Sequence, residues 1–193
     1  GTSRFESTNT ATVQGIETQF DFPKAGFTIG SQVEQDNFQS SSVREIQSTL
    51  WGVFAQEKMT FWDRWIVILG VRGDRNKDYG SSVNPRFSTT FNINENWKVS
   101  ANAGRSFVAP TFANRFTPAA NPNPDLRPET SWQEDGGVEF SLPGRFKTSV
   151  TYFRSDTIDK IVSDSGNLFR ADNFSQAYSQ GIGAYLYILG VLS

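Results

Sequence analysis

Residues Trp97–Gly104 read WKVSANAG, and this short stretch decides the class of fold. Its apolar side chains alternate one by one with polar or small ones: Trp97, Val99, Ala101 and Ala103 against Lys98, Ser100, Asn102 and Gly104. A period of two places the two sets on opposite faces of an extended strand, whereas a helix repeats about every 3.6 residues. The stretch therefore predicts a β-strand with one apolar face.

The same alternation continues on both sides of this stretch. Period-two patterning predicts about nine strands in all, with no helix longer than about two or three turns. The other strand segments are Thr12–Phe22, Phe27–Gln35, Ile46–Phe61, Trp65–Val71, Val83–Ile93, Val138–Phe140, Phe146–Tyr152 and Asn173–Ile188.

The connections between these strands alternate between short and long. The short ones are Phe22–Gly26, Phe61–Arg64, Asn92–Trp97 and Ser141–Arg145, and the long ones are 37–45, 73–82, 107–131 and 156–173. An outer-membrane β-barrel has tight turns on its periplasmic side and long loops outside. A soluble β-sandwich is also compatible with the alternation, but it has no reason to lengthen every second connection. The pattern favours an all-β fold, an antiparallel transmembrane β-barrel segment with short periplasmic turns and long extracellular loops.

The composition excludes several classes of function. Hydrophobic residues make up 37% of the 193 residues, and no stretch approaches the ~20 apolar residues of a spanning helix. A net charge of −2 gives no sign of nucleic-acid binding. The chain has neither His nor Cys, which removes His-based catalysis and imidazole or thiolate metal sites. We therefore expect no enzyme, in particular no outer-membrane hydrolase, and no cofactor or metal.

The stretch Gly104–Gly137 is the most distinctive part of the sequence. It contains SFVAP at Ser106–Pro110 and NPDLRPETS at Asn123–Ser131, separated by a long loop. These motifs resemble the barrel of TonB-dependent outer-membrane receptors. Looser similarities at Phe54–Glu57, at Gly70–Asp74 and from Tyr152 to Ile161 extend the resemblance over most of the chain from about residue 46.

The resemblance implies a receptor for energised uptake of a bulky nutrient, such as a ferric siderophore, a cobalamin or a glycan, in the bacterial outer membrane. Barrels of this family have about 22 strands and a plugged lumen. Residues 1–193 would then be a partial receptor barrel, without the plug domain that contacts TonB and without the remaining strands. We expect an open, curved sheet whose first and last strands do not pair. A passive porin or a small structural outer-membrane barrel is the alternative.

The long loop 107–131 supplies the candidate ligand-binding residues. Aromatic rings offer flat apolar contact, Arg offers an anion fork and Asn offers adaptable hydrogen bonds. The candidates are Phe107, Phe112, Asn114, Arg115, Phe116, Asn121 and Asn123. The prolines of the loop also allow the plainer interpretation of a stiff lid with its Phe residues packed inside.

The alternation assigns side chains to the two faces of the sheet. The set expected to face lipid is Val99, Ala101, Ala103, Val138, Phe140, Val150 and Tyr152, with Lys98, Ser100, Asn102, Glu139 and Lys147 opposite. The charged residues expected to face the lumen are Arg72, Arg86, Lys98, Arg105, Glu134 and Glu139. Indole rings favour the membrane boundary, so Trp62, Trp65 and Trp97 should mark the periplasmic interface, at the end opposite loop 107–131.

Overall fold

The computed structural model describes residues 9–40, 43–116, 121–164 and 170–188. They form one antiparallel sheet in which nine strands pair in chain order. The strands are β1 (Asn9–Phe22), β2 (Phe27–Ser40), β3 (Val43–Phe61), β4 (Trp65–Asn76), β5 (Gly80–Asn92), β6 (Trp97–Val108), β7 (Glu129–Leu142), β8 (Phe146–Asp164) and β9 (Arg170–Ile188). Within the described residues the single helix is α1 (Phe112–Phe116), of five residues. The predicted all-β class and the predicted nine strands are confirmed.

Among the described residues, no helix has both the length and the apolar character needed to cross a membrane.

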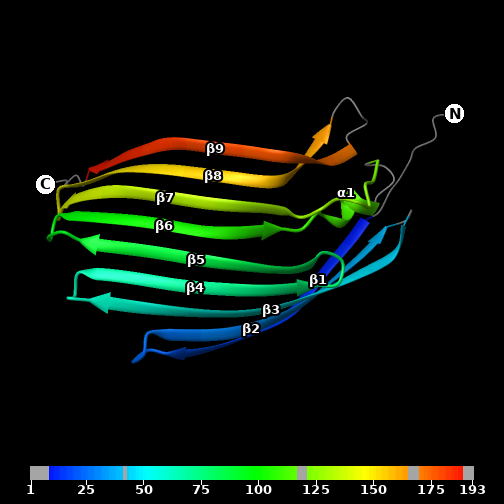
Figure 1. The fold of residues 1–193 in the computed structure, drawn as a ribbon, viewed down its shortest axis with the longest axis horizontal. Coiled ribbons are helices and arrows are strands. Elements are labelled where there is room, and N and C mark those ends of the chain that lie inside the picture. Colours follow the sequence, from blue (N-terminus) through cyan, green and yellow to red (C-terminus); the bar gives the residue numbers. More distant parts are fainter. Residues whose placement is uncertain (1–8, 41–42, 117–120, 165–169, 189–193) are drawn as a thin grey trace, which may run out of the picture.

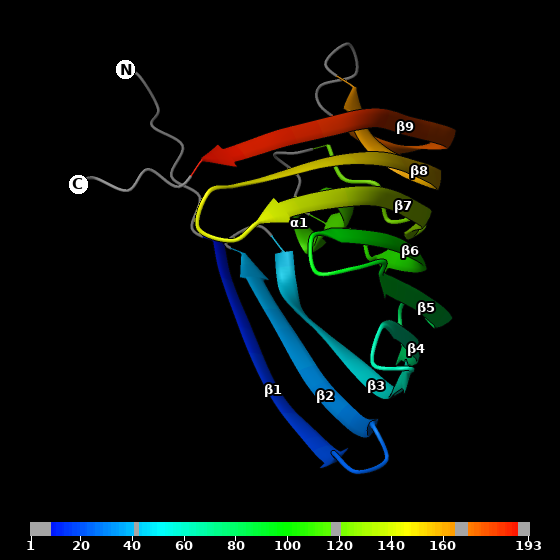
Figure 2. The ribbon, with the colours of Figure 1, turned by 90° about the vertical axis from the view of Figure 1, so that its left-hand side faces the viewer.

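The sheet is bent into an open trough (Figure 1). Figure 2 shows the arc running from β1 through β4 and β5 to β9, with α1 inside the curve. In the part of the chain that the structure describes, β1 pairs only with β2 and β9 only with β8. The expected open sheet, with its first and last strands unpaired to each other, is confirmed.

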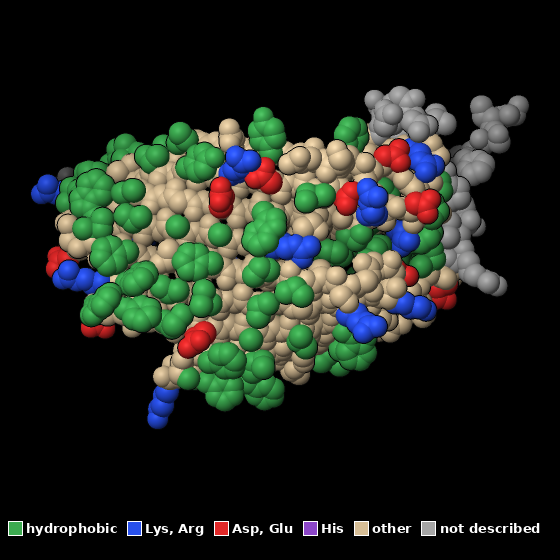
Figure 3. Space-filling view, viewed as in Figure 1, with side chains coloured by type: hydrophobic (Ala, Val, Ile, Leu, Met, Phe, Trp, Pro, Cys, Tyr) green, Lys and Arg blue, Asp and Glu red, His purple; other side chains and the backbone are tan. Residues whose placement is uncertain are grey.

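The convex face of the trough is largely apolar and the concave face is polar. The register aligns Val99, Val138 and Val150 across three strands on one face, and Lys98, Glu139 and Ser149 on the other. Figure 3 views the convex face: apolar side chains spread over the side of the short turns, and charged ones gather mainly toward the loop end. The predicted separation of the apolar and polar sets on β6, β7 and β8 is confirmed.

Two charged residues lie on the other face from the one expected. The register places Glu134 opposite Ala103 and Arg105 opposite Trp132, so both residues belong to the convex side. Both lie toward the loop end of their strands, where Figure 3 shows charged groups on this face. The prediction that they face the lumen was wrong. It was based on their charge alone and did not follow the alternation of side chains along the strand.

Aromatic rings gather at the short-turn end of the sheet. Trp62 stacks on Trp65 with ring centroids 6.3 Å apart, and Trp97 contacts Phe140 at 4.7 Å. The indole N–H of Trp65 donates to Oγ1 of Thr89 at 2.7 Å. Figure 1 shows these turns at the end opposite the segment between β6 and β7. The three Trp residues therefore lie at the end opposite loop 107–131, as predicted, and their position at the periplasmic interface stays a prediction.

The short turns contain the residues that tight hairpins require. Between β7 and β8, Pro143 is followed by Gly144 at a φ of 73°, and the N–H of Arg145 donates to the carbonyl of Leu142 at 3.0 Å. Proline followed by a glycine with positive φ is the signature of a type II turn. Sequence chemistry therefore fixes the register of this hairpin.

The long connections are shorter than the sequence suggested, because the strands continue into them. The expected loop 73–82 is a turn of three residues, 77–79, between β4 and β5. Most of the expected loops 37–45 and 156–173 is strand as well, and their remaining residues 41–42 and 165–169 lie outside the described part. The ends of these strands carry many polar side chains, so their sequence resembles that of loops. Between the described strands, the segment 109–128 is the longest connection.

Replacing Val138 with Arg should destabilise the protein in a lipid bilayer. Val138 lies between Val99 and Val150 on the convex face, two residues along β7 from Phe140 of the aromatic belt. The cost of an Arg that faces hydrocarbon rises from about 0–1 kcal/mol near the interface to about 2–4 kcal/mol at the midplane, so at Val138 it should lie between these limits. Ser100→Arg is the matched control, since it places the same side chain on the concave face opposite Gly137 and should cost about 0.5 kcal/mol. Urea unfolding in lipid vesicles measures both costs, and equal costs would contradict the assignment of faces.

Candidate functional site

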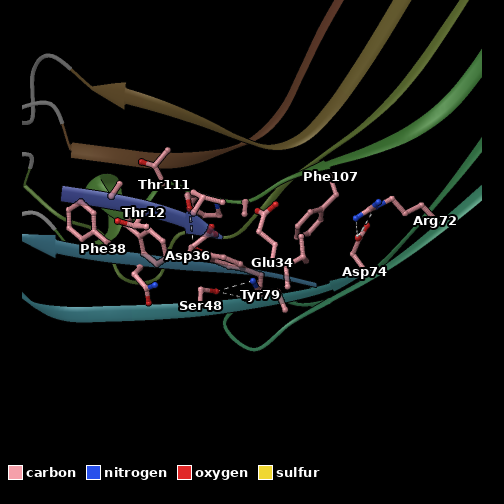
Figure 4. Close-up of a pocket in the computed structure, with 18 residues that line it drawn as sticks. Thr12, Glu34, Asp36, Phe38, Ser48, Arg72, Asp74, Tyr79, Phe107 and Thr111 are labelled. Carbon is pink, nitrogen blue, oxygen red and sulfur yellow. Dashed lines mark hydrogen bonds and ion pairs between the residues drawn. The ribbon is translucent and has the colours of Figure 1, made fainter. Parts of the chain in front are cut away.

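A cavity of about 660 Å³ lies on the concave face at the loop end of the sheet (Figure 4). Its walls come from β1 to β4, from the turn that follows β4, and from segment 107–112. The aromatic and charged side chains that line it are Phe38, Tyr79, Phe107, Phe112, Glu34, Asp36, Arg72 and Asp74. Cavities of this size commonly hold small-molecule ligands.

The cation in the cavity wall, Arg72, is held by two strands. It forms an ion pair with Asp74 at 2.8 Å and donates from Nη2 to Oε1 of Gln32 at 2.7 Å. To reach Gln32 on β2 it crosses β3 at Gly52, where a Cβ would lie only 2.5 Å from Nη2. The absence of a side chain at Gly52 therefore allows Arg72 to lie flat against the wall.

Helix α1 brings an aromatic ring onto the end of β2. Thr111 caps the helix, because its Oγ1 accepts the N–H of Asn114 at 3.2 Å. Phe112, in the first turn, stacks on Phe38 with ring centroids 5.8 Å apart and an interplanar angle of 16°. Phe38 is 6% exposed, so this contact closes the far end of the cavity.

Tyr79 and Arg115 tie the loop to the turn between β4 and β5. The hydroxyl of Tyr79 donates to the carbonyl of Pro110 at 3.0 Å. The guanidinium of Arg115 lies 5.0 Å from the centroid of the Tyr79 ring and donates from Nη2 to the carbonyl of Pro124 at 2.9 Å. Arg115 therefore connects α1, in the first half of segment 109–128, to Pro124 in its second half, and it also contacts Tyr79.

Asn123 fixes the second half of the loop to β9. Its Nδ2 donates to the carbonyl of Ala171 at 3.0 Å and to Oδ1 of Asp172 at 2.7 Å. Its backbone N–H donates to the carbonyl of Asn114 at 2.8 Å. Asn123 is 6% exposed and Ala171 is 1% exposed, so these bonds satisfy groups that water reaches poorly.

The residues after Asn123 continue this attachment onto β8. Glu129 accepts the backbone N–H of Ile161 and the ammonium of Lys160, both at 2.9 Å. The guanidinium of Arg127 donates to Asp159 at 2.6 Å. Because the pairing of β7 with β8 begins only at Thr130 and Ile158, the carboxylate supplies an acceptor that the strand lacks. We call segment Asn123–Glu129, with these contacts, the latch.

Two carboxylates face the cavity without a cationic partner. Glu34 and Asp36 lie two residues apart on β2, so both side chains point the same way. Neither forms an ion pair with any described residue. Gln35, the neighbour of Asp36 along β2, lies on the convex face between Gln14 and Thr49. Because these three side chains are polar, Asp36 lies beyond the apolar band. Burial raises the pKa of the Asp36 carboxyl above its usual value.

The structure separates the sequence-predicted site residues into three groups. Phe107 and Phe112 line the cavity, and Figure 4 shows Phe107 among its lining side chains. Arg115 and Asn123 use their side chains to hold the loop together and to the sheet. The latch motif thus has a structural explanation that its residue types did not reveal.

The other three predicted residues, Asn114, Phe116 and Asn121, are not among the residues that line the cavity. Asn114 acts through its backbone in the helix cap and in the bond to Asn123. The ring of Phe116 lies 4.8 Å from the guanidinium of Arg115, and Asn121 adopts a left-handed conformation with a φ of 48°. No group of metal-binding side chains occurs among the residues that the structure describes.

Sequence reasoning missed the half of the cavity that belongs to the early strands. The missed lining residues are Glu34, Asp36, Phe38, Arg72, Asp74 and Tyr79. The alternation of side chains could have identified them. Counting every second residue along β2 and β4 assigns Glu34, Asp36, Arg72 and Asp74 to the concave face near the loop end. For Phe38, Asp74 and Tyr79 that signal was hidden by treating 37–45 and 73–82 as loops, whereas Glu34 and Asp36 resemble solvated strand residues.

A curved antiparallel sheet with an apolar convex face, an aromatic belt and a cavity inside the curve defines a wall segment of an outer-membrane β-barrel. The chain belongs to the family described as TonB dependent receptor-like, beta-barrel, whose model matches residues 2–186. This is a family of outer-membrane transporters and receptors, not of enzymes.

Individual relatives agree with this assignment. The chain is 30% identical over 130 residues to an iron-regulated outer membrane virulence protein of Vibrio cholerae, covering 63% of the chain and 20% of that protein. It is 38% identical over 96 residues to the vitamin B12 transporter BtuB of Photobacterium profundum, covering 48% and 15%. The chain therefore spans about a fifth of the length of such relatives.

A solved structure supports the fold independently of close sequence similarity. The siderophore receptor PirA from Pseudomonas aeruginosa superimposes with a TM-score of 0.78 at 21% identity, over 92% of this chain and 37% of that one. At this identity the likeness establishes the fold alone.

Replacing Asn123 with Ala should loosen segment 109–128 while leaving the sheet folded. The substitution leaves the buried carbonyl of Ala171 without its donor, and an unsatisfied buried group costs about 1–3 kcal/mol. Amide hydrogen exchange in 109–128 should therefore speed up by about tenfold or more. Asn114→Ala is the control, because the Asn114 side chain forms no hydrogen bond among the described residues. Equal exchange in the two variants would contradict the role of the latch.

Proposed function

We propose that the chain forms part of the barrel wall of a TonB-dependent receptor that takes up a bulky nutrient across the bacterial outer membrane. The observation that carries the proposal is the family match over residues 2–186, combined with a ligand-sized cavity inside the curve of the sheet. In a barrel the concave face is the lumen wall, and its loop end is where a ligand arriving from outside first meets the protein.

The nutrient is an iron complex such as a ferric siderophore, or a cobalamin, by analogy with the iron-regulated outer membrane virulence protein and the vitamin B12 transporter to which the chain is similar. Phe107 and Phe112 would contact it directly, since both line the cavity. The other candidate residues, Asn114, Arg115, Phe116, Asn121 and Asn123, would shape the loop around it. A glycan would use the same aromatic contacts, because flat rings also pack on apolar sugar faces.

The proposal extends to the parts of the receptor that would meet this wall. The open edges of β1 and β9 carry unpaired backbone groups, which hydrocarbon cannot satisfy, so further strands would complete the barrel. On the concave face, Glu139 holds Lys98 at 2.9 Å and Lys147 at 3.0 Å. A plug domain that communicates with TonB would pack over such charges, and lipid would cover the convex face.

An uptake assay with the complete receptor tests this function. Cells that have no other TonB-dependent receptor should accumulate a labelled ferric siderophore or cyanocobalamin when they produce this receptor. The uptake should require TonB, because passage through a plugged barrel needs energy. A matched strain without TonB is the control.

The competing function is that of a passive porin, and the same preparation decides between the two. Purified receptor in lipid vesicles should leave sugars of porin-permeant size outside, as followed by vesicle swelling. Rapid swelling together with TonB-independent uptake would overturn the receptor proposal.

A further inference from the structure

The cavity at the loop end carries an unbalanced negative charge. Its lining contains three carboxylates, Glu34, Asp36 and Asp74, and one cation, Arg72. Arg72 is committed to Asp74 at 2.8 Å and to Gln32 at 2.7 Å. The charges of Glu34 and Asp36 therefore remain uncompensated within the described residues, beside a hollow that is large enough for a ligand.

Aromatic rings line the same cavity as these two carboxylates. Phe38 follows Asp36 by two residues on the same face of β2 and stacks on Phe112, and Phe107 is a further lining residue. Aromatic faces carry partial negative charge and attract cations. Rings and carboxylates therefore favour the same kind of group, which is a cation attached to an apolar or planar body.

Arg115, a cation of the neighbouring loop, does not compensate the net negative charge of the cavity lining. Arg115 lies on the ring of Tyr79 and is bonded to the carbonyl of Pro124, and it does not line the cavity. An anionic chelate entering the cavity would meet Glu34 and Asp36, and no free guanidinium or ammonium of the described lining residues would offset them. Like charges at short range in a partly buried site repel strongly.

Resting on the proposed receptor function, we infer that this cavity selects a positively charged ligand, with Glu34 and Asp36 as the residues that determine its charge preference. The ligand class is a ferric chelate that carries a free ammonium group, rather than an anionic tris-catecholate. The ammonium would bind between the two carboxylates, and the apolar part of the chelate would pack on Phe107 and Phe112.

Binding to the complete, purified receptor tests this inference with two iron probes. The first is a ferric tris-hydroxamate with a pendant ammonium, and the second is a ferric tris-catecholate. The unmodified receptor should bind the first probe more tightly. Glu34→Gln and Asp36→Asn keep the side-chain shape and remove one charge each. Each substitution should therefore lower the affinity for the ammonium probe by about tenfold or more.

A matched control separates a local effect from one of overall charge. Asp135→Asn removes a carboxylate from the concave face of β7, where Asp135 accepts a hydrogen bond from Asn102 outside this cavity. It should leave the affinity for the ammonium probe unchanged. Raising the salt concentration should lower the affinity for that probe more in the unmodified receptor than in Glu34→Gln, because salt screens the attraction between the ammonium and the Glu34 carboxylate.

The outcomes distinguish the inference from the function on which it rests. Tighter binding of the tris-catecholate, or equal effects of Glu34→Gln and Asp135→Asn, would overturn the charge selection while leaving a ferric-chelate receptor intact. Preference for neutral cyanocobalamin over both iron probes would also overturn it. Failure of TonB-dependent uptake for every one of these probes would instead reject the receptor function itself.

Discussion

The backbone hydrogen bond between neighbouring strands is the interaction on which this structure depends. A hydrocarbon environment offers no water to backbone N–H and C=O groups, so each strand must satisfy them through its neighbours. The nine strands do this in unbroken chain order, and each pairs antiparallel with the next. Few side chains are buried among the described residues; the hydrophobic ones are Phe38, Val67, Leu126 and Ala171. Main-chain pairing, rather than a packed two-layer core, therefore holds this sheet.

Three of those four buried residues lie at the loop end, and this distribution has a physical reason. At the short-turn end the sheet needs little beyond tight turns and the aromatic contacts of Trp62, Trp65 and Trp97. At the other end β7 and β8 stop matching in length, and their unpaired groups need other partners. The latch provides them through Glu129 and Asn123, and its own residue Leu126 is buried, with 4% exposure. The latch also fixes the place where Phe112 meets Phe38.

Period-two alternation predicted the nine strands and both faces of β6 to β8, because strand geometry leaves little freedom once the register is set. The open sheet was expected for another reason, the resemblance of the chain to part of a larger barrel. It did not predict where strands end at the loop side. Beyond the apolar band both faces meet water, so residues such as Asp74 and Arg75 in β4 lose the alternation while keeping the ladder. The ligand-site prediction suffered for the same reason. Phe107 and Phe112 could be read from the loop, whereas Glu34 and Asp36 look like solvated strand residues until β2 is seen to curve under α1.

The latch and the cavity constrain each other through the loop that connects them. Segment 109–128 is fixed at one side by Tyr79, which bonds to Pro110, and at the other by Asn123, which bonds to β9. Between these two attachments α1 spans the inside of the curve (Figure 2). A change in the curvature of the sheet would move β2 relative to β9 and would separate Phe112 from Phe38. The shape of the cavity is therefore a property of the whole arc, since no single strand positions both its aromatic and its acidic wall.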